Sequence, residues 1–293
     1  MPNIRVIRRR IRSVQSTAKI TKAMELVAAS KMRRAQASAL GSRPYAGQLH
    51  EVLSHLSAAG AEGDAALHPL LAVRDPVRVA LIIEITPDRG LCGGLNTNIN
   101  RRAVQLALEL RERGADVHIV NAGRKGRDFF VRTGYPIEAE FSPLPDYPSM
   151  ADAVPISGLA IQEFLTGAAD QVWLVYPRFV NTTIQRPEVL QLLPVVPPSA
   201  DAAVREKYAD YIFEPSPEGV LAALLPRYVE IQVYRAVLEL AASEQSARMV
   251  AMRNATDAAQ EMIQELTLIR NKVRQEQITK ELLDITGGVE AMS

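Results

Sequence analysis

Cysteine is almost absent from this sequence, because Cys92 is the only one among 293 residues. An internal disulfide and a metal site built from paired cysteines are therefore excluded, and the usage fits a reducing compartment. Long apolar runs are also missing, since none reaches the roughly 18–20 residues of a membrane-spanning helix. Arginines interrupt every possible apolar core near the N-terminus, so a secretory signal is not expected; an Arg-rich organelle transit peptide is the alternative.

Proline and glycine are absent from the sixty residues between Arg227 and Thr286. This predicts one helix of about 90 Å, whereas a globular helix averages about 11–12 residues. Gly287 and Gly288 are expected to end it. A helix this long cannot bury its own apolar stripe, so it needs a partner helix. The expected stripe has heptad spacing and comprises Ala259, Met262, Leu266, Ile269 and Val273, then, in a shifted phase, Ile278, Leu282 and Ile285.

A second long helix is expected over residues 3–40, which contain no proline or glycine. Gly41, Pro44 and Gly47 predict a break or kink after it. Apolar patterning resumes at Leu49, so a helix that continues past the proline is the alternative, and residues 60–64 are expected to form a loop. The apolar stripe of this helix comprises Ile4, Ile7, Ile11, Val14 and Ala18, then, in a shifted phase, Met24, Ala28, Met32, Ala35 and Ala39.

Short β-branched runs alternate with helical runs between the two long helices, which is typical of an α/β layer with a largely parallel sheet. Pro187 would confine the last strand to an edge or a bulge. The stretch up to Pro226 is expected to form a hinge into the last helix. The expected strands are 77–85, 116–120, 137–141, 172–176 and 182–193, and the expected helices are 95–113, 124–132 and 156–166.

Two apolar stripes at opposite ends of one chain are most simply buried against each other. The predicted fold class is therefore α/β plus a long coiled coil, in which the N- and C-terminal helices form an antiparallel two-helix coiled coil with an inserted Rossmann-like α/β domain. The expected segments are an N-terminal coiled-coil helix over residues 1–60, the α/β domain over 75–195, and a C-terminal coiled-coil helix over 205–293.

The glycine-rich segment from Asp88 to Asn96 follows an expected strand and opens an expected helix, where a phosphate-binding loop would lie. It lacks the Lys-Ser/Thr of a Walker loop and the G-x-G-x-x-G spacing, so a tight turn is the favoured interpretation. Nothing in the sequence brings a base such as His118 to Cys92, and the other histidines lack zinc-ligand spacing. We therefore predict no catalytic, cofactor-binding or metal-binding residues.

Residues 1–40 carry ten lysines and arginines and only one acid, Glu25. The basic residues could bind nucleic acid, an anionic membrane or an acidic protein, or form the solvated face of a coiled coil. Alanines recur along the last helix, where they favour close helix packing or, alternatively, a smooth shaft that can turn within a sleeve. The arginines at the N-terminus are Arg5, Arg8, Arg9, Arg10 and Arg12.

Three stretches, in family order, resemble the gamma subunit of F-type ATP synthase: Ile11–Gln36 (IRSVQSTAKITKAMELVAASKMRRAQ), Asp88–Asn98 (DRGLCGGLNTN) and Ser246–Ile285, with RMVAM, ATD and NKVRQ. The departures are small, with Pro87 where serine or threonine is common and Glu276-Gln277 where small residues are common.

The resemblance implies a non-catalytic rotor subunit in the central stalk of the proton-transporting ATP synthase. Its partners would be the alpha and beta subunits, the epsilon subunit and the membrane c-ring, with no cofactor and no nucleic acid. Rotation would couple ion flow to ATP synthesis or hydrolysis at the beta subunits. The implied location is peripheral, on the cytoplasmic face of the bacterial plasma membrane, with an organelle inner membrane as the alternative.

By position, the resemblance also implies five contacts with the beta subunits. Met24 and Arg248 would meet their moving loops, whereas Arg274, Gln275 and Thr279 would form a hydrogen-bonding catch. Packing in the helix seam is the alternative for Met24, and solvent exposure for the other four. Two other classes of function stay open on the residues alone, namely a nucleotide-binding enzyme with a coiled-coil arm and a basic adaptor for nucleic acid or membrane.

Overall fold

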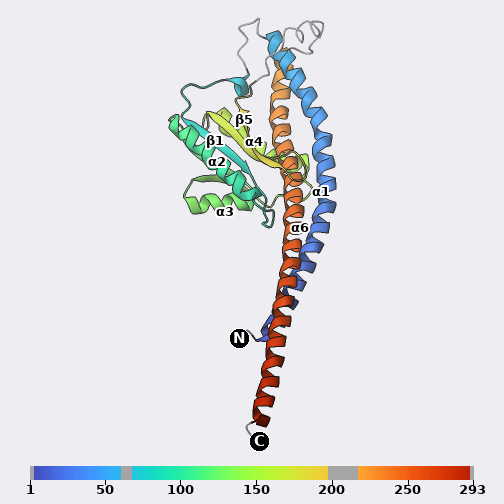
Figure 1. Ribbon diagram of the computed structural model, residues 1–293. Helices are drawn as coiled ribbons and strands as arrows, with labels where there is room; N and C mark the ends of the chain where they lie inside the picture. The colour runs from blue at the N-terminus through green and yellow to red at the C-terminus, as the bar shows by residue number, and fades with distance from the viewer. Residues whose placement is uncertain (1–2, 61–67, 197–216, 291–293) are drawn as a thin grey trace. The chain divides into compact units, whose positions relative to one another are not determined.

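A computed structural model describes residues 3–60, 68–196 and 217–290. The chain divides into two compact units, one made of residues 1–28 and 248–293 and the other of residues 29–247. Two long helices, α1 (Ile4–Gly60) and α6 (Pro217–Glu290), contribute to both units. Within each unit they lie side by side and run in opposite directions (Figure 1).

Both helices run through residues that were expected to interrupt them, and α1 follows the alternative in which the helix continues past Pro44. Gly41, Pro44 and Gly47 lie inside α1, and the proposed hinge at Pro226 lies inside α6, which begins at Pro217. A proline removes one backbone hydrogen bond, to the carbonyl four residues before it. For both prolines that residue, Leu40 or Ala222, is exposed, so water can bind the freed carbonyl.

The expected end of α6 at Gly287 and Gly288 is also wrong, because the helix continues to Glu290. Glycine permits a left-handed cap but does not impose one, and in a helix it costs only about 1 kcal/mol relative to alanine. Of the expected loop, residues 61–64 lie outside the described residues, as do residues 205–216 of the expected C-terminal segment.

In the first unit, α1 and α6 bury a continuous heptad seam. Ile7 and Ile11 pack with Val273 at one end, and further along the seam the hydroxyl groups of Thr21 and Thr256 share a buried hydrogen bond of 2.7 Å. This pairing confirms the antiparallel coiled coil. The seam runs through positions 4, 7, 11, 14, 18, 21, 25 and 28 of α1 and through 249, 252, 256, 259, 263, 266, 270 and 273 of α6.

The seam differs from the predicted stripes where polar residues complete it. Met262 and Ile269 are 47% and 46% exposed, because the seam passes through Ile263 and Arg270 instead. The phase shift expected at Met24 does not occur either. Thr21 and Glu25 carry the seam of α1 onward, so a search for apolar side chains alone misses it.

Glu25 is buried in this seam and is held by two cations. Lys22 Nζ donates to it at 2.9 Å and Arg253 Nε at 3.3 Å. The hydrogen bond from Lys22 lowers the pKa of the Glu25 carboxyl, and Arg253 lowers it further. A charged layer of this kind fixes which residues of the two helices face each other.

The second unit contains a five-stranded sheet in the order β3-β2-β1-β4-β5. Four strands are parallel, and β5 pairs antiparallel with β4 at the edge, so the largely parallel sheet is confirmed. Pro187 lies in the edge strand, opposite Pro177. The strands are β1 (Val79–Ile85), β2 (Asp116–Ala122), β3 (Ile137–Phe141), β4 (Gln171–Phe179) and β5 (Gln185–Leu193).

Helices cover both faces of the sheet. The helices α2 (Leu95–Glu112) and α3 (Arg124–Thr133) pack on the face that carries Ile82. The short helix η1 (Pro69–Leu71), α4 (Met150–Thr166) and the first part of α6 pack on the face that carries Ile83. The helix α4 begins six residues earlier than expected, because the Asp152 carboxylate caps it by accepting the Ser149 N–H at 2.7 Å.

The hydrogen bond between Thr21 and Thr256 predicts an energetic coupling within the helix pair. Replacing either threonine with valine should lower the free energy of unfolding by about 1 kcal/mol, and the double variant should lose less than the two losses added together. Urea denaturation of the four proteins, followed by circular dichroism, measures this coupling. Strictly additive losses would show that the two hydroxyl groups do not interact.

Candidate functional site

Met24 lies half-buried on α1, beside the seam of the first unit rather than in it. Ile20 and Val27, four residues before and three after it, are 60% and 57% exposed. Side chains at this spacing share one face of a helix. Met24 therefore belongs to an exposed apolar stripe, formed by Ile20, Met24 and Val27, that does not take part in the helix pairing.

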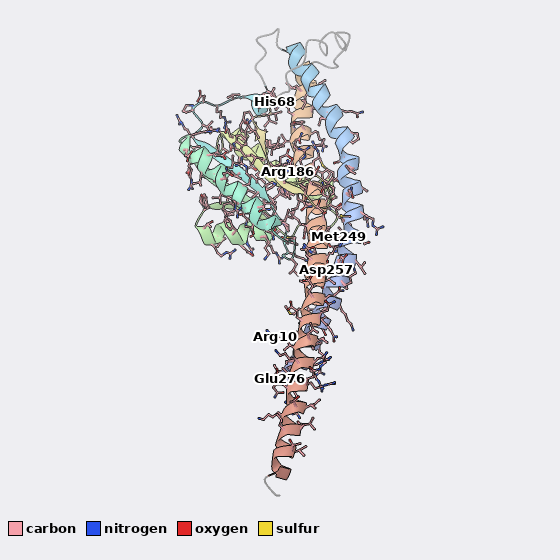
Figure 2. The ribbon with its side chains drawn as sticks, viewed as in Figure 1. Arg10, His68, Arg186, Met249, Asp257 and Glu276 are labelled. Atoms are coloured by element: carbon pink, nitrogen blue, oxygen red, sulfur yellow. The ribbon has the colours of Figure 1, made fainter. Side chains whose placement is uncertain are left out.

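Arg274, Gln275 and Thr279 are all exposed on α6, directly after the last seam residue, Val273. The Thr279 hydroxyl donates to the Gln275 backbone carbonyl at 2.9 Å. Helical spacing puts Thr279 about one turn after Arg274 and Gln275. Figure 2 marks Glu276, which belongs to the same turn as Arg274 and Gln275.

The five predicted contact residues form two separate groups. Arg248 lies half-buried on α6 and has interactions of its own. Arg274 follows it by 26 residues, about 39 Å along the helix axis. Because Glu25 reaches Arg253, five residues along α6 from Arg248, Met24 lies within about 8 Å of Arg248 along the helix axis. Met24 and Arg248 therefore lie toward one end of the first unit, and Arg274, Gln275 and Thr279 lie toward the other.

The end of α6 exposes an apolar surface that the predicted site residues do not include. Beyond Val273, no described residue of α1 packs against α6. Ile278, Leu282 and Ile285 lie on one face of this single helix and are 47%, 59% and 64% exposed. A contiguous exposed apolar surface of this kind marks a site of protein interaction.

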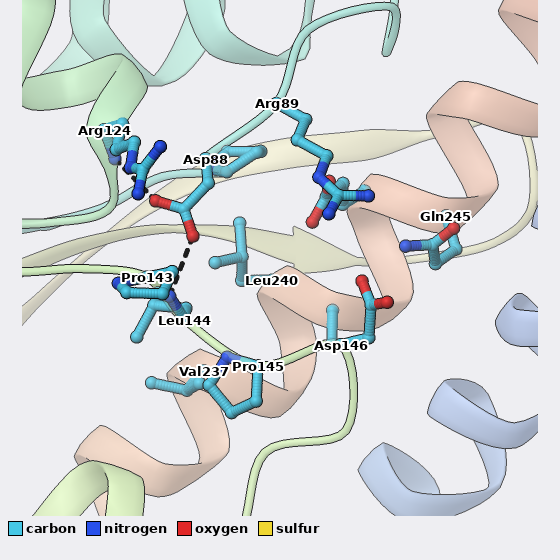
Figure 3. Close-up of a pocket in the computed structure, with 13 residues that line it drawn as sticks. Asp88, Arg89, Arg124, Pro143, Leu144, Pro145, Asp146, Val237, Leu240 and Gln245 are labelled. Atoms are coloured by element: carbon cyan, nitrogen blue, oxygen red, sulfur yellow. Dashed lines mark hydrogen bonds between the residues drawn. The ribbon is translucent and has the colours of Figure 1, made fainter.

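The glycine-rich segment after β1 forms a tight turn at the carboxyl end of the sheet. Its Asp88 carboxylate accepts the Arg124 N–H at 2.9 Å and the Leu144 N–H at 2.8 Å. Figure 3 shows these bonds at the wall of a cavity of about 420 Å³ that α6 also lines. Both oxygens of Asp88 are occupied by backbone amides, so this carboxylate ties the turn to α3 and to the segment after β3.

Cys92 and His118, the two residues considered as a nucleophile and a base, lie at different ends of the sheet. Cys92 is buried in the turn after β1, where its thiol donates to the Arg89 carbonyl at 3.9 Å. His118 is in β2, where it pairs with Glu138 and Asp116. Among the described residues there is no group of histidines, cysteines and acids that could hold a metal ion.

Glu84, which the sequence does not single out, is a fully buried acid in β1. Asn121 Nδ2 donates to its Oε2 at 2.9 Å, and Asn100, with its amide turned so that nitrogen faces the acid, donates to Oε1 at 3.0 Å. A Cβ on Gly126 would collide with the carboxylate, which explains why α3 carries a glycine. Burial raises the pKa of Glu84 to about 8, although the Asn121 hydrogen bond lowers it.

This buried acid predicts a dependence of stability on pH. The pKa is raised from 4.5 to about 8 in the folded protein, so the native state binds more protons than the unfolded state between these values. The free energy of unfolding should therefore fall as pH rises from 5 to 8. Glu84→Gln should remove much of this fall and make the protein more stable at pH 8, by up to a few kcal/mol.

Urea denaturation at pH 5, 6, 7 and 8 measures this effect. Glu112→Gln, which changes an exposed carboxyl at the end of α2, is the matched control and should behave like the wild type. Parallel pH profiles for Glu84→Gln and the wild type would contradict the assignment.

Comparison with known proteins agrees with this architecture. The ATP synthase family model matches residues 3–292. The ATP synthase gamma chain of Dehalococcoides mccartyi is 51% identical over 293 residues and that of Roseiflexus castenholzii 50%; each match covers 100% of this chain and 100% and 99% of the relative, respectively.

Solved structures share the fold. A chain from the central stalk and c-ring of the Tetrahymena thermophila mitochondrial ATP synthase superposes with a TM-score of 0.61 at 27% identity, covering 80% of this chain and 99% of that one. A chain from the rotor of the Euglena gracilis mitochondrial ATP synthase gives 0.66 at 19% identity, covering 94% and 98%.

The two-helix coiled coil with an inserted α/β domain is thus the fold of ATP synthase central-stalk subunits. The chain belongs to the ATP synthase gamma chain family, which confirms the prediction of a central-stalk rotor subunit.

Proposed function

We propose that this chain turns inside a ring of alternating alpha and beta subunits and couples ion flow through the membrane c-ring to ATP synthesis or hydrolysis at the beta subunits. The observation that carries the proposal is the heptad seam between α1 and α6, which makes a stiff antiparallel helix pair in the first unit. Each orientation of an asymmetric shaft would favour one conformation of the sites around it, which is a mechanical form of population shift.

In this proposal the chain contributes no catalytic residue of its own, and ATP chemistry takes place on the beta subunits. The division into residues 1–60, 75–195 and 205–293 follows from it, with two helical segments for the shaft and one α/β segment beside them. The epsilon subunit and the c-ring would bind at the foot of the stalk.

Met24 and Arg248 are proposed to meet the moving loops of the beta subunits. The exposed apolar stripe of Ile20, Met24 and Val27 supports this role, because it offers an apolar surface that the helix pairing leaves uncovered. The exposed arginines of the first turns of α1, Arg8 among them, would face acidic side chains of the ring and assist docking.

Arg274, Gln275 and Thr279 are proposed to form the hydrogen-bonding catch with the beta subunits. Their exposure leaves the Arg274 guanidinium and the Gln275 amide open to a partner. The adjoining apolar face of Ile278 and Leu282 would be buried in the same contact, which gives the catch a water-poor setting in which hydrogen bonds count for more.

The proposed location is the cytoplasmic face of the bacterial plasma membrane, reached through the complex. The relatives that support it come from bacteria. In the described part of the chain, no helix is long and apolar enough to cross a bilayer.

Reconstitution tests the proposed function. When the chain is mixed with alpha and beta subunits, it should copurify at one copy per three alpha and three beta subunits, and the ATPase rate should rise. Size-exclusion chromatography with quantitative gel densitometry gives the ratio. An equal ATPase rate with and without this chain would refute the rotor function. Salt-sensitive DNA binding without a complex would favour the basic adaptor instead.

The proposed catch predicts the effect of a double substitution. Arg274→Ala with Gln275→Ala should lower the rate of ATP synthesis by about fivefold or more, because it removes hydrogen bonds worth about 1 kcal/mol or more in total. The isolated chain should stay folded, since both side chains are exposed. Glu276→Ala with Gln277→Ala, also exposed on this part of α6, is the matched control. Unchanged synthesis in the first variant would remove the catch.

A further inference from the structure

In the second unit, three polar side chains on one face of α6 bond the end of β4 and the turn that follows it. Glu239 Oε2 accepts the Phe179 N–H at 2.7 Å, Ser243 Oγ donates to the Pro177 carbonyl at 3.1 Å, and Ser246 Oγ donates to the Thr182 carbonyl at 2.6 Å. Spacings of four and three residues keep these three side chains in one row.

The bonds from Glu239 and Ser243 replace strand pairing that β4 lacks at its end. The ladder between β1 and β4 stops at Val175, whereas β4 continues to Phe179. In the described part of the chain, no strand other than β5 pairs with these last residues. A buried backbone group without a partner costs free energy, so the α6 side chains satisfy groups that a strand would otherwise bond.

All three side chains are buried. Glu239 is 5% exposed, and Ser243 and Ser246 are fully covered. A carboxylate is rarely placed in such a position unless hydrogen bonds hold it. The Phe179 side chain belongs to a buried apolar cluster that joins β4 to both long helices, with Ala35 and Ala39 from α1 and Leu238, Ala241 and Ala242 from α6.

Apolar packing alone would hold the sheet against α6 without fixing where along the helix it lies, because the hydrophobic effect has no direction. Hydrogen bonds depend steeply on distance and angle. A shift of one helical turn, about 5.4 Å, would break this match in either direction. Either the Glu239 carboxylate would face the Pro177 carbonyl, which is also an acceptor, or Ser243 would take the Phe179 N–H and leave Ala247, which has no donor in its side chain, opposite the Pro177 carbonyl. The polar row therefore allows one position of the sheet on the helix.

We propose that Glu239, Ser243 and Ser246 form a polar lock that transmits torque between the sheet and α6. The inference rests on the proposed rotor function. Glu239 is the main positioning residue, because it bonds the backbone of Phe179, whose side chain packs with both long helices. If these hydrogen bonds are lost, the sheet can shift along α6 when torque is applied, and part of the rotation is not transmitted.

Membrane vesicles that carry the assembled enzyme, with this chain as its gamma-type subunit, test the lock. In each variant, ATP hydrolysis and ATP-driven proton pumping are measured on the same vesicles. Glu239→Leu removes the acceptor and keeps the size of the side chain. It should lower the protons pumped per ATP by about fivefold or more, because the loss of a buried hydrogen bond changes a two-state population by at least about that factor. Glu239→Gln keeps an acceptor oxygen and should pump like the wild type.

Hydrogen exchange of the Phe179 amide in the full chain shows whether the bond itself has been lost. The amide should be protected in the wild type and in Glu239→Gln but not in Glu239→Leu. Normal pumping per ATP in Glu239→Leu, or a Phe179 amide that stays protected there, would overturn the proposal.

A second variant keeps the proposal open to refutation if Glu239→Leu does not assemble. Ser243→Ala with Ser246→Ala removes only two hydroxyl groups and should also lower the protons pumped per ATP; wild-type pumping in that variant would overturn the lock. A wild-type chain that supports no ATP-driven pumping would count against the rotor function itself. If the wild type and the variants all pump the same number of protons per ATP, the result would count against the lock alone.

Discussion

The structure depends on the fact that a long helix with an apolar stripe cannot bury that stripe by itself. The α6 helix has 74 residues, and most of its seam is covered by another part of the same chain. Pairing two helices from opposite ends of a sequence requires the chain to reverse direction, and the α/β segment provides that reversal. Pairing and insertion are therefore two results of one requirement for burial.

Polar residues inside the apolar contacts decide how the parts fit together. Thr21 and Glu25 lie in the seam of the first unit, where they set which turns of the two helices face each other. Glu84 joins Asn121 of β2 and Asn100 of α2, and Glu239 holds α6 on β4. Apolar packing supplies most of the stabilisation in each case. The buried polar group selects one arrangement among several that would bury a similar apolar area.

Composition and periodicity are enough to predict the fold class, because the spacing of apolar residues marks both the two helix stripes and the alternating strands. They failed where the structure uses something else. Thr21, Glu25 and Arg270 continue the seam although their side chains are polar. Pro44 and Gly287, where a break and a helix end were expected, both lie inside long helices. Glu84 and Glu239 could not be found in advance, because a single acid in a sequence carries no sign of which backbone or amide will surround it.

The uncovered end of α6 has a consequence for how such a subunit is produced. Leu282 and Leu283 on this end are 59% and 65% exposed, and exposed leucine and isoleucine side chains tend to associate in water. Exposed apolar surface of this kind favours aggregation. We therefore expect the chain to be more soluble when the proteins that cover this end are made in proportion to it.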